Sequence, residues 1–215
     1  MANSDPFNQY VQDYEDWFSG HRHVYFSEVE AIRHFIPHGK KGVEIGVGTG
    51  RFAVPLQIKI GVDPSGAMGD IARNQGIEVY DGIAEALPFR SHYFDFALMV
   101  TTVCFVDDIL KSFAEANRIL KPGGSFILGM VDGDSELGKV YKKLKDKNKF
   151  YRIATFFSVG EVIGFLHRSG FGDVKIVQTV FGDIDSIAET QPFQAGYGKG
   201  GFVVLKATKL VEIKQ

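Results

Sequence analysis

Cysteine is nearly absent from this chain, since Cys104 is the only one among 215 residues. One thiol cannot form an intrachain disulfide, which excludes a disulfide-stabilised scaffold and makes a cytoplasmic location the expectation. Long apolar runs are absent as well, and no stretch approaches the roughly 20 residues needed to cross a bilayer. Residues 1–5 lack the positive charge that begins a secretion signal. The sequence therefore predicts a soluble, intracellular protein without a membrane span.

An excess of charge of either sign is also missing. The 24 basic and 26 acidic residues leave a net charge of −2, so no general attraction to nucleic acid is expected. Internal repeats and low-complexity tracts are absent too. With 45% hydrophobic residues the chain can bury a sizeable core, and residues 1–215 are expected to form a single domain.

Three glycines stand close together at the end of a short apolar run. Residues 43–47 have the composition of a buried parallel strand, and Gly46, Gly48 and Gly50 alternate with other residues at its end. Because glycine has no Cβ, the chain can turn sharply there and a ligand can lie against the backbone. Open α/β sheets bind ligands at this place, the carboxyl end of a parallel strand. The segment therefore predicts a ligand site.

An acid closes the second apolar run. Asp63 follows residues 58–62 directly, and a carboxylate at the tip of the neighbouring strand can accept hydrogen bonds from both hydroxyls of a ribose. Arg51 occupies the position where a dinucleotide-binding fingerprint needs its third glycine. Glu44 adds an acid that would repel a pyrophosphate and suit a cationic ligand. These residues favour a nucleoside that carries positive charge.

The same residues resemble the first motif of the class I S-adenosylmethionine-dependent methyltransferases, with Asp63 at the position of the ribose-binding acid. Residues 81–89 (DGIAEALPF) and 118–124 (RILKPGG) resemble later segments of that family. Residues 43–207 as a whole are similar to its small-molecule subgroup, related to enzymes of the ubiquinone and menaquinone pathways. The resemblance implies an α/β fold: a Rossmann-like, doubly wound sheet of seven mostly parallel strands, the last antiparallel, with helices on both faces.

The resemblance also implies S-adenosylmethionine as the cofactor, with S-adenosylhomocysteine as its product. Glu44 would meet the ammonium group of the cofactor, the glycines would allow its approach, and Asp63 would hold its ribose. Ile83 stands where the family commonly has aspartate, so adenine selection would rest on backbone groups near Ala84 and on apolar contact. The predicted cofactor-binding set is Glu44, Gly46, Gly48, Gly50, Asp63, Pro64, Met68, Ile83, Ala84, Thr101 and Tyr14.

Several members of this set have an alternative interpretation or a second role. Met68 would lie beside the adenine with Pro64, but it fits the hydrophobic core equally well. Thr101, after the strand at 93–100, would form the floor where the cofactor and the acceptor meet. Residues 14–18 (YEDWF) resemble the family's N-terminal segment over the cofactor, and an aromatic face near the sulfonium could contribute about 0.5–2 kcal/mol. The alternative for Tyr14 and Trp17 is packing of the helices onto the sheet.

Hydrophobic periodicity predicts the other elements. Two helices are expected within residues 7–36, separated by a loop at 20–25, and a short crossover helix is expected at 51–57. Asp107 or Asp108 and Ser158 are expected to cap the helices that follow them. Further strands are expected at 77–80, 93–100, 125–131, 174–181 and 202–207. The predicted divisions are an N-terminal helical cap (1–40), a cofactor-binding half (41–131), a helical lid insertion (132–157) and a C-terminal helix with antiparallel strands (158–215).

The insertion is rich in basic residues, and two interpretations of it stay open. Its lysines either form a solvated helix face or belong to a cap over the substrate mouth that favours an anionic acceptor. The basic residues are Lys139, Lys142, Lys143, Lys145, Lys147, Lys149 and Arg152.

No catalytic residue is identifiable in the sequence. His21, His23, Tyr25 and Asp132 are candidates for a deprotonating base. No carboxylate–histidine cluster indicates a metal site, and no basic neighbour makes Cys104 a nucleophile. The Asn-Pro-Pro-aromatic motif of methylases that act on nucleobases or glutamine is absent after residue 100, which disfavours those substrates.

The predicted function is methyl transfer from S-adenosylmethionine to a small-molecule acceptor by direct displacement, without nucleic acid as a partner. The acceptor, its reacting atom and the oligomeric state stay open. One alternative is a catalytically silent protein that binds S-adenosylmethionine and acts through a partner. The other is a nicotinamide-dependent oxidoreductase, which Arg51 disfavours.

Overall fold

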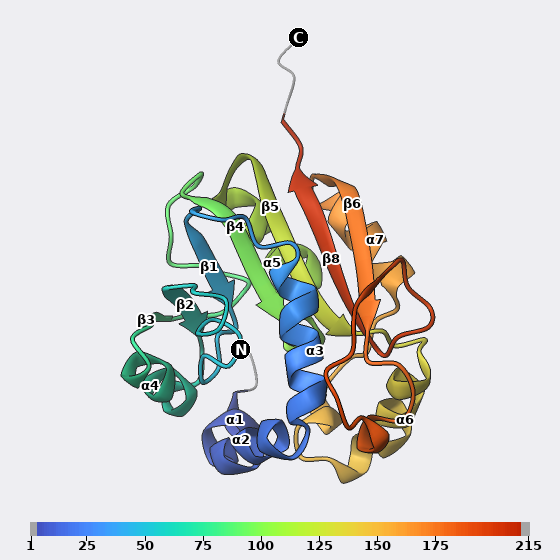
Figure 1. Ribbon diagram of the computed structural model, residues 1–215. Coiled ribbons are helices and arrows are strands. Elements are labelled where there is room, and N and C mark those ends of the chain that lie inside the picture. The colour runs from blue at the N-terminus through green and yellow to red at the C-terminus, as the bar shows by residue number, and fades with distance from the viewer. Residues whose placement is uncertain (1–3, 212–215) are drawn as a thin grey trace.

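The computed structural model describes residues 4–211, which form one eight-stranded sheet with helices on both faces (Figure 1). The strand order is β3-β2-β1-β4-β5-β8-β6-β7. The first five strands of this order run parallel, whereas β8 is antiparallel to both β5 and β6. The predicted α/β fold with a mostly parallel, doubly wound sheet is therefore confirmed.

The strands differ in length: β1, β2 and β3 have four residues each, β5, β6 and β8 have eight or more, and β7 has two. They are β1 (Gly42–Ile45), β2 (Ile60–Asp63), β3 (Glu78–Asp81), β4 (Phe94–Val100), β5 (Leu120–Val131), β6 (Phe171–Thr179), β7 (Gln194–Ala195) and β8 (Phe202–Lys209). Strand β4 is buried along almost its whole length, as expected for a central strand covered on both faces.

The helices and 3-10 turns fall between these strands or before them. They are α1 (Asp5–Gln9), α2 (Val11–Gly20), α3 (Arg22–Arg33), α4 (Gly66–Asn74), η1 (Val103–Phe105), α5 (Ile109–Ile119), α6 (Glu136–Leu144), η2 (Lys145–Lys147), η3 (Tyr151–Ile153), α7 (Val159–Arg168) and η4 (Ile184–Ser186). Asp108 caps α5 and Ser158 caps α7 with a full capping box, which confirms both predicted N-caps.

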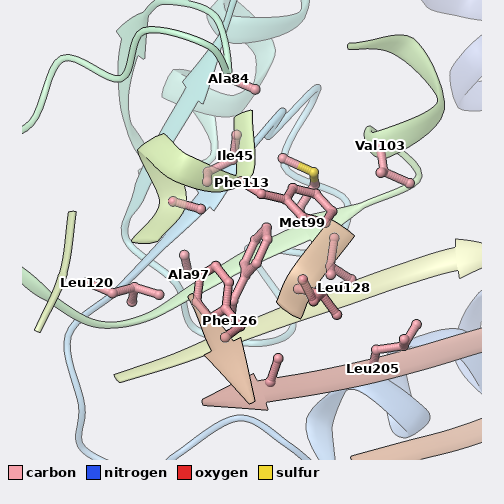
Figure 2. Packing of buried hydrophobic residues seen from close by; sticks show 14 of the residues in the cluster. Ile45, Ala84, Ala97, Met99, Val103, Phe113, Leu120, Phe126, Leu128 and Leu205 are labelled. Atoms are coloured by element: carbon pink, nitrogen blue, oxygen red, sulfur yellow. The ribbon is translucent and has the colours of Figure 1, made fainter. Parts of the chain in front are cut away.

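Two apolar cores cover the two faces of the sheet. On one face, Phe113 of α5 and Val162 of α7 pack against strand residues such as Met99 and Phe126 (Figure 2). On the other face, α3 and the segment around Phe52 pack against the sheet. Helices α1 and α2 lie at the edge where β1 and β4 end (Figure 1). The two cores therefore hold the sheet in place, with the carboxyl ends of β1 and β4 beside the N-terminal helices (Figure 1).

The sheet has eight strands, so the predicted count of seven was wrong. The additional strand, β7, has only two exposed residues and pairs Ala195 with Val177 and Gln194 with Gln178. Two exposed residues carry no apolar alternation, which is the signal that reveals a half-buried strand.

Two helix predictions also need correction. The N-terminal region has three helices, and the loop predicted at 20–25 is wrong because α3 already begins at Arg22. Val24, 1% exposed, belongs to the buried face of that helix. Residues 51–57 form successive turns without an α-helix. Pro55 lacks the N–H that a continuous helical ladder requires in this short connection.

No helix among residues 4–211 has the length and apolar character that crossing a bilayer requires.

Candidate functional site

Two adjoining cavities lie at the carboxyl edge of the sheet. The first, called here the strand-tip pocket, is lined by residues that follow β1, β2, β3 and β4. The second, called the helical cavity, measures about 270 Å³ and is lined by residues of α2, α3, α6 and the 3-10 turns η1 and η3. Phe7, Tyr14, Thr101 and Phe105 line both cavities and form a shared wall. Anything bound in one cavity therefore lies next to the contents of the other.

The glycine segment after β1 forms part of the strand-tip pocket and depends on the absence of side chains. Gly46 has a φ of +74°, and a Cβ there would lie 2.3 Å from Thr102 Oγ1. A Cβ on Gly48, whose φ is +53°, would lie 3.2 Å from the Tyr14 hydroxyl. The backbone is thus held bare at the pocket wall.

Gly50 has a different role from that of the other two glycines. A Cβ at this position would lie 2.6 Å from Ile77 Cδ1 in the core, and Gly50 is not among the residues that line the pocket. The structure therefore explains Gly50 by close packing, and its contact with a cofactor stays a prediction.

Asp63 ends β2 and is held in a fixed orientation at the pocket. Its Oδ2 accepts a hydrogen bond of 2.7 Å from Gly48 N, and its Oδ1 accepts one of 2.8 Å from Ser65 N. Burial raises the pKa of Asp63, and the two backbone hydrogen bonds oppose that rise. Each carboxylate oxygen can accept a further bond, so the group can still receive the two hydroxyls of a ribose.

Glu44 lies behind the glycine segment and is 1% exposed. Burial and the charge of Asp63 raise the pKa of Glu44 well above its usual range, and a hydrogen bond from Ala53 N lowers it. Its Oε2 has no hydrogen-bond partner among the residues that the structure describes. Glu44 is not among the residues lining the pocket, but an unpartnered buried carboxylate oxygen calls for a cation or a donor.

The far side of the strand-tip pocket is mostly apolar. Pro64, Met68, Ile83 and Ala84 all line it. Met68 is 1% exposed and also lines the pocket, so it is a core residue and a wall residue at once, and its contact with adenine stays a prediction. A flat heterocycle fits between apolar walls of this kind.

Helix α2 is attached to the glycine segment by Arg51. The guanidinium of Arg51 pairs with Glu15, whose Oε1 also accepts a 2.5 Å hydrogen bond from Thr49 Oγ1. Tyr25 of α3 donates a 2.5 Å hydrogen bond to Arg51 O. Arg51, at the position where a dinucleotide-binding site has glycine, therefore attaches the N-terminal helices to the glycine segment.

Tyr14 and Thr101 are the polar members of the shared wall. Burial, followed by the charges of Glu44 and Asp63, raises the pKa of Tyr14 far above its usual range, so its hydroxyl stays protonated. Thr101 has a φ of +48°, a conformation that costs a non-glycine residue about 1–3 kcal/mol and occurs at functional sites. The strained residue thus lies where the two cavities meet.

The walls of the helical cavity are largely aromatic. Tyr141 of α6 lies 4.5 Å from Tyr151 of η3 between ring centroids, and Phe156 lies within 6.0 Å of both rings. Cys104 also lines the cavity, and burial raises the pKa of its thiol to about 12. A protonated thiol is a poor nucleophile, in agreement with the prediction that Cys104 is inert.

One carboxyl in the helical cavity went unnoticed in the sequence. Glu28 of α3 lines the cavity and is 5% exposed. Burial raises its pKa to about 8. The signal that could have found it is its spacing: Glu28 is four residues after Val24 and four before Ile32, so an acid occupies the buried stripe of an amphipathic helix.

The four candidate bases do not line either cavity. His21 Nδ1 is 3.0 Å from Trp17 O, and its Nε2 is 3.4 Å from Asp185 Oδ1. Tyr25 donates to Arg51 O, and Asp132 Oδ1 accepts a hydrogen bond from Asp134 N. Within residues 4–211, no cluster of His, Cys, Asp and Glu side chains could hold a metal ion.

The insertion contributes to the helical cavity with its apolar side. Leu137, Tyr141, Phe150, Tyr151, Phe156 and Phe157 line the cavity. Most of its basic residues face solvent, namely Lys139, Lys142, Lys143, Lys147 and Arg152. The insertion therefore combines a solvated outer face with an inner face that covers the cavity.

The comparisons with known proteins agree with this geometry. Residues 43–128 match the family described as "Methyltransferase domain". A solved structure from Thermotoga maritima, named as an S-adenosylmethionine-dependent methyltransferase and possible histamine N-methyltransferase, is 51% identical, covers 95% of this chain and 98% of its own, and superposes with a TM-score of 0.93. An uncharacterized protein of Methanocaldococcus jannaschii is 46% identical over 95% of this chain and 98% of its own length. The demethylmenaquinone methyltransferase of Staphylococcus saprophyticus is 26% identical over 66% of this chain and 74% of its own.

Proposed function

This chain belongs to the class I S-adenosylmethionine-dependent methyltransferases, and on that premise we propose that it methylates a small molecule bound in the helical cavity. S-adenosylmethionine is the cofactor. Family membership leaves the nicotinamide-dependent oxidoreductase without support.

The residues of the strand-tip pocket fit this cofactor. The bare backbone at Gly46 and Gly48 leaves room for its methionyl part, and the oriented carboxylate of Asp63 can accept hydrogen bonds from its ribose. The unpartnered Oε2 of Glu44 suits the cofactor's ammonium group. Pro64, Met68, Ile83 and Ala84 offer apolar contact to adenine. These assignments are part of the proposal.

The single observation that carries the proposal is the wall that the two cavities share. When bound, S-adenosylmethionine would supply a methyl group on a sulfonium: a lone pair of the acceptor would form the new bond to the methyl carbon while the carbon–sulfur bond breaks, with its electrons left on the sulfur of the thioether. Tyr14 and Thr101 would position the two partners against each other, since both residues face both cavities. Alignment of this kind can be equivalent to an effective molarity of about 10⁵–10⁸ M.

A small-molecule acceptor is proposed because the helical cavity is covered by helices. We assign residues 1–40 as its cap and residues 132–157 as its lid, since both segments supply wall residues such as Trp17 and Tyr151. A cytoplasmic location is proposed on the free thiol of Cys104.

The test is a labelled-methyl assay. The protein is incubated with S-adenosylmethionine carrying a labelled methyl group and a fractionated metabolite extract, and any labelled product is identified by mass spectrometry. An amine panel that contains histamine is added because of the name of the Thermotoga relative. A labelled small molecule that depends on the protein supports the proposal.

A catalytically silent binding protein is the second candidate. It predicts tight binding of S-adenosylmethionine in calorimetry and no transfer to any fraction. If neither S-adenosylmethionine nor S-adenosylhomocysteine binds to the protein, both candidates are contradicted.

A further inference from the structure

Glu28 is a buried acid in a cavity whose walls are otherwise mostly apolar or aromatic. It lies in the middle of α3, between Ser27 and Val29, which are both buried. The side chain lines the helical cavity although only 5% of its surface is exposed. A carboxyl group in such a place is costly unless something pairs with it.

No partner for this carboxyl is present among residues 4–211. Burial is the sole cause of the rise in its pKa to about 8, with no hydrogen bond and no cation opposing it. The other acid that lines the cavity, Asp13, differs in this respect, because its Oδ2 lies 2.6 Å from Lys149 Nζ. Of the two acids that line the cavity, Glu28 is therefore the one without a hydrogen-bond or ion-pair partner.

Aromatic rings surround the same cavity. Tyr141, Tyr151 and Phe156 form a cluster with centroid separations of 4.5–6.0 Å, and Trp17 lines the cavity from α2. The face of an aromatic ring attracts a cation, and rings combined with one carboxylate form the usual cage for an alkylammonium group. The rings and Glu28 thus favour the same ligand charge.

We propose that Glu28 binds a protonated nitrogen of the methyl acceptor, distinct from the atom whose lone pair receives the methyl group, so that the enzyme selects amines over neutral or anionic molecules of the same shape. This inference rests on the proposed function, because it places the acceptor in the helical cavity. Glu28 acts here as a specificity-determining residue. The nitrogen donates hydrogen bonds to the carboxylate, and the rings surround the remainder of the ligand.

The basic insertion does not oppose this charge preference. Lys139, Lys142, Lys143 and Lys147 face solvent, and Lys149 at the cavity is paired with Asp13. Among the described residues that line the cavity, Lys149 is paired and Glu28 is the carboxyl group without a partner, so the cavity interior favours a cationic acceptor over an anionic one.

Binding of an ammonium group to Glu28 should be accompanied by a measurable release of protons. The tyrosines and the cysteine around Glu28 stay protonated near neutral pH, because burial raises the pKa of Tyr141 and of Cys104 to about 12 and raises those of Tyr14, Tyr25 and Tyr151 as well. Asp13 and Lys149 neutralise each other at the cavity, and His21 lies beside Asp185 at the neighbouring η4. Binding of an ammonium at pH 7 should therefore release about one proton from Glu28.

The experiment measures binding to the protein saturated with S-adenosylhomocysteine. The ligands are 2-phenylethylamine and histamine as cations, 2-phenylethanol as a neutral isostere and 3-phenylpropanoate as an anion. Calorimetry is run at pH 7 in two buffers of different ionisation enthalpy, which yields the number of protons released. The variants are Glu28→Gln and, as a matched control, Glu30→Gln, an exposed acid on the same helix.

The expected result is that at least one amine binds 10-fold or more tightly than 2-phenylethanol and releases about one proton. Glu28→Gln should lose that preference and the proton release, while Glu30→Gln keeps both. Binding of the neutral or anionic ligand as tightly as the amines, an unchanged preference in Glu28→Gln, or failure of every amine to bind would each overturn the inference. Failure of S-adenosylhomocysteine itself to bind would instead contradict the proposed function.

Discussion

The strand-tip pocket and the helical cavity share a wall but are built in opposite ways. The strand-tip pocket is formed largely by segments that end or follow parallel strands, and the Gly48 N–H donates to the carboxylate of Asp63 at the tip of the neighbouring strand. The helical cavity is formed by large side chains on α2, α3, α6 and η3, which come from separate parts of the chain. The first site is therefore set by local geometry, whereas the second is set by how helices assemble.

This difference predicts where substitutions act. A change in the strand-tip pocket should affect folding or the cofactor, because the backbone there has no alternative arrangement. A change in the helical cavity should affect the acceptor, because helix side chains can vary without moving the sheet.

The largest expected effect is that of Gly46→Ala. The new Cβ would lie 2.3 Å from Thr102 Oγ1, and the φ of +74° disfavours any side chain. Strain and overpacking together should cost about 2–4 kcal/mol, measured as a lower melting temperature, with loss of S-adenosylmethionine binding in calorimetry. The control is Gly39→Ala, which has a φ of +67° and open space around it, so it carries the strain without the clash. Equal effects of the two substitutions would show that the pocket backbone is not specially constrained.

Asp63→Ala should follow, and it should weaken cofactor binding in addition to removing the acceptor of the Gly48 and Ser65 N–H groups. Hydrogen bonds to a charged group contribute about 1.5–3 kcal/mol, so the affinity for S-adenosylmethionine should fall about 100-fold in calorimetry. The exposed Asp70→Ala on α4 is the control and should leave affinity unchanged. Unchanged affinity in Asp63→Ala would refute the ribose assignment and remove the basis for contrasting the two sites.

Glu28→Gln should have a smaller and opposite effect on stability in the empty protein. The folded-state pKa of about 8 lies above the usual value of 4.5, so the carboxyl's favourable contribution is complete below pH 4.5 and is lost as the pH rises toward 8. The neutral amide avoids this loss. The difference in free energy of unfolding between the variant and the wild type should therefore shift in favour of the variant between pH 4 and pH 9. The expected shift is at least about 1.4 kcal/mol, which corresponds to one pKa unit.

Chemical denaturation at the two pH values measures this gain. Glu30→Gln, at the solvent-exposed surface of α3, should change stability by less than about 0.5 kcal/mol at both. A Glu28→Gln variant that is no more stable than the wild type at pH 9 would indicate that Glu28 is already paired, and the helical cavity would then resemble the strand-tip pocket more closely.

The smallest effect is expected at the rim of the helical cavity. Asp13 and Lys149 form an ion pair at side-chain exposures of 52% and 39%, and pairs of this kind are worth about 0–1 kcal/mol. A double-mutant cycle with Asp13→Asn and Lys149→Met should give a coupling energy below 1 kcal/mol that decreases with salt. A coupling energy above about 2 kcal/mol would mean that this ion pair holds the insertion against α2 strongly, and the contrast between the two sites would be weakened.

The same contrast explains what could be predicted from the sequence. A parallel strand and its tip occupy one short segment, so Asp63 and the glycines can be proposed from the sequence. Gly46, Gly48 and Asp63 do line one pocket, and their contact with the cofactor stays a prediction. Gly50 shows the limit of the motif: its lack of a side chain is explained by close packing against Ile77 in the core. The spacing alone does not distinguish close approach of a ligand from close packing of a helix segment.

Glu28 could not be assigned because its importance depends on distant partners. The sequence shows an acid within an apolar stripe, but only the packing of α3 near Tyr141 and Tyr151 makes that acid part of a cavity. Strand β7 was missed for a similar reason, since its two residues are ordered by pairing with β6 and not by their own composition. Tertiary packing, which the local sequence of neither segment specifies, decides both cases.

The shared wall limits how such an enzyme could diverge in substrate range. Substitutions on η3, α6 or the middle of α3 would reshape the helical cavity and leave the strand-tip pocket intact. A substitution at Tyr14 or Thr101 alters both cavities at once. A change there that widens the range of acceptors should therefore also weaken cofactor binding. Directed evolution toward new acceptors should therefore accumulate its changes in the lid and in α3, and should leave these two positions almost untouched.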